Sequence, residues 1–162
     1  MNVTFMSDGI IQIDDARIVF RNFTGVGSKY NRAGDRNFAV VIDDEAVAEA
    51  MIAEGWKVKI KPPREEGAEP FMYLPVKVKF NQRGPIVYLK TGAKMNTLDE
   101  ESVSCLDDVE ITSVDMDLRP YDWKMDDGSS GRTAYLRSIC VTQRVDRFAE
   151  RYSEVDDMDL PM

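Results

Sequence analysis

The sequence predicts a mainly β protein with one or two short helices. Apolar and polar residues alternate with period 2 in several short segments, clusters of turn-forming residues separate those segments, and only one long stretch shows helical spacing. The chain has 162 residues, of which 43% are hydrophobic and 31% charged, so it can bury the core of one compact domain. Neither an internal repeat nor a second domain is visible.

Alternation predicts about seven strands. The first, "ARIVFRNFTG", predicts a core face of Ala16, Ile18 and Phe20 and an opposite face of Arg17, Val19, Arg21 and Phe23. The other strand candidates are residues 37–42, 56–61, 75–80, 86–90, 109–125 and 132–144. The last two flank "DDGSSG", which is typical of a hairpin turn.

Two of these strands carry lysine stripes. "WKVKIKPP" alternates apolar residues with Lys57, Lys59 and Lys61, and "PVKVKF" does the same with Lys77 and Lys79. One face of each strand is then core and the other cationic. Such lysines either bind an anion or are a solvated face that blocks edge pairing, and the pattern leaves both readings open.

Two helices are predicted between the strands. Residues 43–55 open on carboxylates, repeat apolar residues at helical spacing and close on Gly55 as a C-cap. Residues 97–106 are a shorter candidate, in which Thr97 and Glu100 have the spacing of a capping box. Residues 24–36 and 62–70 are predicted to be long loops.

Short antiparallel strands with one capping helix predict a small, closed or nearly closed barrel. The oligonucleotide-binding (OB) fold is the member of that class that binds single strands on its face. We therefore expect an OB-like antiparallel β-barrel over residues 1–149, followed by an acidic, disordered tail over residues 150–162.

Composition argues against several classes of function. The chain has no His and only two Cys, Cys105 and Cys140, so the common zinc patterns, a disulfide framework and a His-activated nucleophile are excluded. Acidic pairs such as Asp107-Asp108 and Asp126-Asp127 adjoin turns or helix starts, where carboxylates act as caps. We expect no enzyme activity, no metal and no cofactor, and keep a metal-dependent nuclease as a remote alternative.

Charge is distributed unevenly along the chain. The net charge is −8, yet residues 17–94 carry +5, whereas residues 95–149 carry −6 and residues 150–162 carry −4. Local potential rather than total charge steers a polyanion, so the central segment is a candidate phosphate-binding surface.

Aromatic and basic residues alternate on the same strands. "DLRPYDW" places Arg119, Tyr121 and Trp123 on one face, and the first strand places Arg17, Arg21 and Phe23 together. Flat side chains stack on unpaired bases while cations follow the phosphates, a combination typical of sequence-independent binding of single strands. These residues, with Lys57, Lys59, Lys77 and Lys79, are the predicted nucleic-acid site, although any one aromatic could instead be core packing.

The last residues, "EVDDMDLPM", resemble the C-terminal tip of bacterial and phage single-stranded DNA-binding proteins. The resemblance rests on Asp156, Asp157, Asp159, Leu160, Pro161 and Met162, with Met162 in place of a terminal Phe. It implies a tail that competes with DNA for the basic groove and docks replication and repair proteins through its apolar end. A plain acidic solubility tail is the alternative.

A second resemblance is independent of the tail. "YNRAGDRNFAVVID", "EGWKVK" and "LRPYDWKMDDGSSGRTAYLRSICVT" are similar to stretches of a family of small phage-encoded proteins taken to bind single-stranded DNA with an OB-like fold. It implies a protein that coats and protects single-stranded DNA in phage replication or recombination. An acidic DNA mimic or anti-defence protein and a virion or adaptor β-barrel are the alternatives.

Location and assembly follow from weaker signals. No apolar run approaches the roughly 20 residues that span a bilayer, and "MNVTFMSDGIIQIDD" lacks the basic start of a secretory signal. We expect no membrane association and a cytoplasmic location, which is the host cytoplasm for a phage protein. A homo-oligomer is compatible with the sequence.

Overall fold

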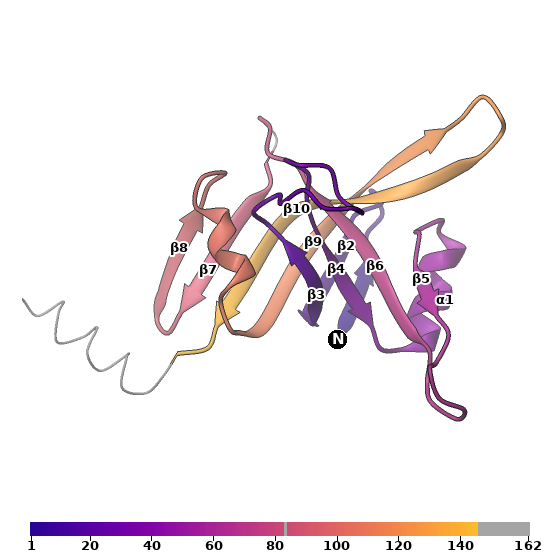
Figure 1. The fold of residues 1–162 in the computed structure, drawn as a ribbon, viewed down its shortest axis with the longest axis horizontal. Coiled ribbons are helices and arrows are strands. Elements are labelled where there is room, and N and C mark those ends of the chain that lie inside the picture. The colour runs from indigo at the N-terminus through magenta and orange to yellow at the C-terminus, as the bar shows by residue number, and fades with distance from the viewer. Residues whose placement is uncertain (83, 146–162) are drawn as a thin grey trace, which may run out of the picture.

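The computed structural model describes residues 1–82 and 84–145. About half of these described residues lie in strands, and they also include one α-helix and one 3-10 helix (Figure 1). The strands are β1 (Asn2–Phe5), β2 (Ile11–Ala16), β3 (Ile18–Asn22), β4 (Arg36–Ile42), β5 (Lys59–Lys61), β6 (Phe71–Val78), β7 (Ile86–Thr91), β8 (Lys94–Leu98), β9 (Ile111–Lys124) and β10 (Ser130–Gln143), and the helices are α1 (Glu45–Ala53) and the 3-10 helix η1 (Val103–Asp107).

The strands form one sheet in the order β1-β2-β9-β10-β6-β4-β3. β5 adds to β6, and β7 and β8 form a hairpin beside β10. The sheet is not closed by pairing between its two ends, but β2 and β3 are separated only by Arg17, so the chain itself passes from one end to the other. Counting β2 and β3 as one bent strand gives a five-stranded, partly open barrel, which is an OB-like fold.

Two pairings correct the expectation of a purely antiparallel barrel. β10 runs parallel to β6 at Ala134 and Tyr135, and parallel to β7 from Ser138 to Gln143. Parallel neighbours need a long connection, and residues 92–129, which include β8, η1 and β9, supply it between β7 and β10. Alternation along a strand is the same in both kinds of pairing and could not reveal this.

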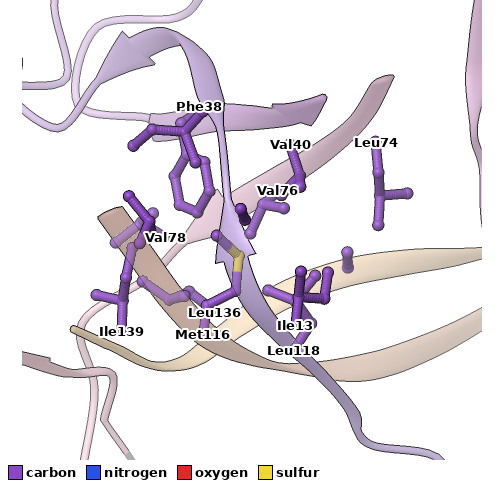
Figure 2. Close-up of a cluster of buried hydrophobic side chains, with 14 of the residues drawn as sticks. Ile13, Phe38, Val40, Leu74, Val76, Val78, Met116, Leu118, Leu136 and Ile139 are labelled. Atoms are coloured by element: carbon purple, nitrogen blue, oxygen red, sulfur yellow. The ribbon is translucent and has the colours of Figure 1, made fainter. Parts of the chain in front are cut away.

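The core lies between the two walls of the barrel. Figure 2 shows Phe38 and Val40 of β4, Val76 of β6, Met116 of β9 and Leu136 of β10 converging on one interior. These side chains are at most 3% exposed, and the described residues include no buried polar or charged side chain. Inward positions recur at every second residue, so the predicted strands place their apolar faces correctly wherever the strands stay regular.

The first predicted helix is confirmed as α1. The Asp44 carboxylate accepts hydrogen bonds from the backbone N–H groups of Ala46 and Val47, which makes it the N-cap, and Gly55 follows the helix with a φ of +96°. Ala48 and Met51 are buried against the barrel. None of the described helices is long and apolar enough to cross a membrane.

The second predicted helix is wrong. Lys94–Leu98 is β8, and only the 3-10 helix η1 follows, so Thr97 is a strand residue and caps nothing. The local turn is organised by Asp99, whose carboxylate accepts hydrogen bonds from the backbone N–H groups of Glu101 and Ser102 and from the Ser102 hydroxyl. An Asp side chain bonded in this way favours a turn over a helix.

The first predicted strand contains an irregularity that reverses its alternation. Phe20 has a φ of +54°, and the β3–β4 register shifts between Val19 and Asn22. A left-handed backbone at a residue with a bulky side chain costs roughly 1–2 kcal/mol. The bulge turns Phe20 outward, where it is 57% exposed, although period 2 predicts it in the core.

The β9–β10 hairpin projects from the barrel, and its turn is the predicted one (Figure 1). Met125 donates its backbone N–H to Ser129, and the Asp127 carboxylate accepts hydrogen bonds from the backbone N–H and the hydroxyl of Ser129. Hydrogen bonds within the turn therefore stabilise it. In the part of the hairpin that projects from the barrel, β9 and β10 pair with each other in register.

Candidate nucleic-acid interface

Side chains that alternate with the core residues form the outer face of the barrel. Arg119 of β9 pairs with Tyr135 of β10, Tyr135 pairs with Lys77 of β6, and Lys77 pairs with Asn37 of β4. Their strand neighbours Leu118, Ala134, Leu136, Val76, Val78 and Phe38 all point into the core. One row of polar and aromatic side chains thus crosses four neighbouring strands on the outside of the barrel.

An aromatic cluster lies at the base of the projecting hairpin. The rings of Tyr121 and Tyr135 meet edge to face with centroids 5.9 Å apart, and the Arg119 guanidinium lies 5.0 Å from the Tyr135 centroid. Farther along the hairpin, the Trp123 Nε1 donates a hydrogen bond to the Thr133 hydroxyl at 3.2 Å. We call Arg119, Tyr121, Trp123 and Tyr135 the hairpin cluster. Tyr121 is 54% exposed, so its ring is open to a ligand.

Trp123 is held from the side of the barrel by Lys57. The Lys57 Nζ lies 4.2 Å from the centroid of the Trp123 ring, a cation–π distance. Gly131, opposite Trp123 in the β9–β10 register, makes room for both side chains. A Cβ on Gly131 would come within 2.7 Å of the Trp123 ring and closer still to the Lys57 side chain.

A basic groove of about 490 Å³ continues from the hairpin cluster. It is lined by Arg36, Asn37, Lys77, Lys79 and Tyr135, together with residues of the loop over 31–36. Arg36 forms an ion pair with Glu100 at 3.3 Å, and Arg32 faces Asp35 at 4.0 Å. Among the described residues no carboxylate pairs with Lys77 or Lys79, so these two ammonium groups supply the uncompensated charge of the groove.

The groove wall is fixed by hydrogen bonds. The Arg36 Nε donates to the backbone carbonyl of Phe23 at 3.0 Å, and the Asn37 amide donates to the Asn31 amide oxygen at 2.8 Å. Asp107 accepts hydrogen bonds from the backbone N–H groups of Phe23 and Thr24 and from the Thr24 hydroxyl. The loop that borders the groove is therefore attached at several points before any ligand arrives.

One ion pair stiffens the hairpin beside the cluster. The Arg132 guanidinium donates to both oxygens of Asp122, at 2.7 and 3.2 Å, and also lies 5.5 Å from the Trp56 centroid. These hydrogen bonds hold the pKa of the Asp122 carboxyl below its usual value and raise the pKa of Arg132. The pair fixes the hairpin where it leaves the barrel.

The predicted site residues do not all lie together. The structure brings together Lys57, Arg119, Tyr121 and Trp123, with Lys77 and Lys79 in the adjoining groove. Lys59 is exposed on β5 at the position opposite Tyr73. The predicted tail residues Asp156, Asp157, Asp159, Leu160, Pro161 and Met162 lie outside the described residues.

The three residues predicted on the first strand lie elsewhere. Phe23 is fully buried and stacks on Phe38 with centroids 5.2 Å apart, so no base can reach its ring, which corrects the sequence-based expectation. Arg21 donates from one terminal nitrogen to the backbone carbonyls of Leu106 and Val109, both at 2.8 Å, and ties η1 to β3. Arg17 lines a separate cavity with Arg21 and Asp43. The bulge at Phe20 explains why Phe23 points into the core.

Sequence reasoning missed Tyr135, Arg36 and Asn37. The alternation that selected Tyr121 could also have selected Tyr135. Its neighbours Ala134 and Leu136 are apolar and point inward, so Tyr135 must point outward. Arg36 ends the predicted loop over residues 24–36 and Asn37 begins the predicted strand over 37–42, and nothing in the sequence signals that these residues border a groove.

The described residues show no metal-binding constellation. In the ranges 1–82 and 84–145 no group of three or more His, Cys, Asp or Glu side chains could hold a metal ion. Asp44, Asp107 and Asp127 instead cap backbone N–H groups. Cys105 and Cys140 are free and half-buried, and burial raises the pKa of both thiols, which disfavours the reactive thiolate.

Comparison with protein families identifies the chain. The family model described as "Putative phage ssDNA-binding domain" matches residues 3–161. The chain belongs to this family. No curated protein is similar enough in sequence to match it.

Solved structures similar to this phage single-stranded DNA-binding family member come from bacteriophage Enc34. The "Single-stranded DNA-binding protein from bacteriophage Enc34" has a TM-score of 0.55 and 14% identity, with 98% of this chain and 94% of that chain covered. The same protein "in complex with ssDNA" has a TM-score of 0.54 and 14% identity, with 91% and 93% covered. At this identity the likeness supports the OB-like fold of the family member.

Proposed function

We propose that this family member binds single-stranded DNA on its outer face, with bases on the hairpin cluster and phosphates along the basic groove. One observation carries the proposal: Tyr135 belongs to both the hairpin cluster and the basic groove. Its ring contacts Tyr121 and Arg119, and the same side chain lines the groove with Lys77 and Lys79. A strand whose base stacks at Tyr121 therefore has cationic side chains within reach of its neighbouring phosphates.

The chemistry of this surface favours binding without sequence preference. Every base has a π-face that can stack on Tyr or Trp, and a lysine ammonium contacts any phosphate. Reading a base requires an unused amide or guanidinium aimed at its edge. The amides of Asn31 and Asn37 bond to each other, and the Arg132 guanidinium is engaged by Asp122.

Single strands suit this surface better than duplex. The rings of a duplex are stacked on one another and unavailable, whereas those of an unpaired strand can lie on exposed side chains. The solved complex with single-stranded DNA in a protein of the same fold supports this choice of ligand. We infer a role in coating and protecting unpaired DNA during phage replication or recombination, in the host cytoplasm and without catalysis.

The tail completes the proposal. Residues 150–162 carry five carboxylates and one arginine and end in Leu160, Pro161 and Met162. Because they belong to the same chain as the basic groove, such carboxylates would be at high effective concentration near it and would compete weakly with DNA. The apolar tip would dock replication or repair proteins. Assembly into a homo-oligomer on DNA is compatible with this arrangement.

Binding of fluorescent dT oligomers and of duplex of equal length, each at two salt concentrations, tests the proposal. We expect tighter binding to the single strand, with a log–log salt slope of about −0.7 per contacted phosphate. A mixed-sequence oligomer should bind about as well as dT. Equal affinity for duplex, or no binding to either at low salt, would contradict the proposal.

A further inference from the structure

A second group of aromatic rings lies on the outer face, away from the hairpin cluster. The Phe20 ring of β3 meets Tyr73 of β6 edge to face with centroids 5.5 Å apart, and meets Phe71 in the same way at 6.2 Å. The Phe71 and Tyr73 rings are 5.4 Å apart. We call Phe20, Phe71, Tyr73 and Lys61 the β6 cluster.

The β6 cluster carries positive charge beside its rings. The Lys61 Nζ lies 5.5 Å from the Phe20 centroid and 5.7 Å from the Tyr73 centroid, and Lys59 lies opposite Tyr73 in the β5–β6 register. Within the described part of the chain, no ion pair engages Lys59 or Lys61. Together with the exposed Phe20 ring and the half-buried Phe71 and Tyr73 rings, these ammonium groups form a surface for an aromatic anion.

The backbone conformation at Phe20 is the reason that its side chain is exposed. The left-handed conformation of Phe20 and the register shift beside it direct the ring out of the barrel, whereas a regular strand would bury it. More than half of its side chain remains in contact with solvent even though two other rings touch it. A strained, exposed aromatic is characteristic of a ligand site rather than of core packing.

The β6 cluster is in line with the basic groove. Tyr73, Pro75 and Lys77 alternate with the core residues Leu74 and Val76, so all three lie on the outer face of β6. Tyr73 and Lys77 are separated by four residues, about 13 Å at the rise of a β-strand. About four nucleotides at the 3.4 Å spacing of a stacked strand cover that distance.

We propose that the β6 cluster is a second base-stacking platform, which receives the same single strand after it crosses Lys77. The inference rests on the proposed function, and it adds that the binding site is long and has two stacking centres. A DNA strand that reaches only the hairpin cluster stacks its bases on one platform. A DNA strand long enough to pass over β6 stacks on both platforms.

The test compares dT oligomers from about 4 to about 16 nucleotides, the range of site sizes for OB folds. Phe20→Asn removes the ring but tolerates the left-handed backbone, and Tyr73→Leu keeps apolar bulk. Met95→Ala, which truncates an exposed apolar side chain on β8, is the matched control. With Phe20→Asn or Tyr73→Leu, affinity for long oligomers should fall about 5- to 150-fold per lost stack, while the shortest oligomers bind nearly as before.

Failure of this inference is distinguishable from failure of the proposed function. If wild type binds single strands, Tyr121→Ala weakens binding, and Phe20→Asn binds every length normally, the second platform is absent although the function stands. If wild type binds no single strand, both fail.

Photo-crosslinking of wild type with dT oligomers that contain 5-iodouracil gives an answer independent of variant folding. Adducts on the peptides that contain Phe20 or Tyr73, found with long oligomers, support the second platform. Adducts confined to the hairpin peptides at every length would overturn it.

Discussion

The Lys57 ammonium lies 4.2 Å from the centroid of the Trp123 ring, although the two residues come from different parts of the fold. Lys57 follows α1 and the buried Trp56, whereas Trp123 lies near the end of β9. Their contact joins the projecting hairpin to the barrel and orients an aromatic ring before any ligand arrives. Ordering the ring in advance reduces the entropy lost on binding.

Gly131→Ala should disturb this contact. A methyl group at Gly131 would overlap Trp123 and Lys57, and the stiff ring has less freedom to move than the lysine end. We expect weaker single-strand binding and a changed near-UV circular dichroism signal from Trp123. Ser130→Ala, one residue earlier on the same strand, is the control and should behave as wild type. A Gly131→Ala protein with unaltered affinity and spectrum would show that the ring position is not set by this glycine.

Tyr121→Ala should weaken binding of single-stranded DNA by about 1–3 kcal/mol, the usual value of one base stack. The side chain is more than half exposed, so the thermal unfolding midpoint should change little. Fluorescence anisotropy with a dT oligomer measures the loss. Met125→Ala removes a comparably exposed side chain from the tip of the same hairpin and should bind normally. A folded Tyr121→Ala protein with wild-type affinity would place the bases on another face.

Lys77→Gln and Lys79→Gln should each reduce the salt dependence of single-strand binding. Each lysine that neutralises a phosphate contributes about 0.7 to the log–log slope on single strands, so each variant should flatten the slope by up to that amount. Lys94→Gln on β8, outside the groove, should leave the slope unchanged. The measurement is a series of affinities across salt concentrations. Equal slopes for Lys77→Gln and wild type would remove Lys77 from the phosphate path.

Asp122→Asn should lower stability at neutral pH but not in acid. Hydrogen bonds from Arg132 depress the pKa of Asp122 in the folded state, so the ionised carboxylate stabilises that state. The contribution is present above the unfolded pKa of about 4 and is lost as pH falls through the lower folded value. The Asp122 side chain is largely exposed, so the difference should be no more than about 1 kcal/mol. Urea unfolding at pH 7 and below pH 3 checks it, and a difference that persists in acid would contradict this account.

Removal of residues 154–162 should tighten DNA binding at low salt. The deletion removes four carboxylates that we propose compete for the groove, and the difference should shrink at high salt as the attraction is screened. Replacing only Leu160, Pro161 and Met162 leaves the charge intact, so DNA affinity should stay the same while capture of a replication or repair partner is lost. Affinity unaltered by the deletion at every salt concentration would argue against competition.

Alternation predicted most of the fold because most strands are regular. It located β4, β6, β7, β9 and β10 within a few residues and selected Tyr121 and Trp123 as outward aromatics. The same rule failed at Phe20 and Phe23, where one bulge exchanges the inner and outer faces. A bulge is fixed by pairing with β4, which a single strand sequence does not contain.

Other features depend on contacts that are distant in the sequence. β1 and β8 are short and almost wholly exposed, so they carry little apolar signal. The contact of Lys57 with Trp123 requires Trp56 to be buried and Gly131 to lie opposite, and no local pattern expresses both conditions. The sequence thus predicted most residues of the hairpin cluster, whereas the contacts among them could be found only in the three-dimensional structure.

The pairing of β10 bears on how the protein folds. β10 hydrogen-bonds to β9 along its length, to β6 in one half and to β7 in the other, so it pairs with three parts of the barrel. Contacts between segments so far apart in sequence raise the contact order and slow folding. During synthesis, the edge of β6 that pairs with β10 must wait unpaired until β10 emerges from the ribosome. This late strand also carries Tyr135, so the barrel and the surface proposed to bind DNA are completed in the same step.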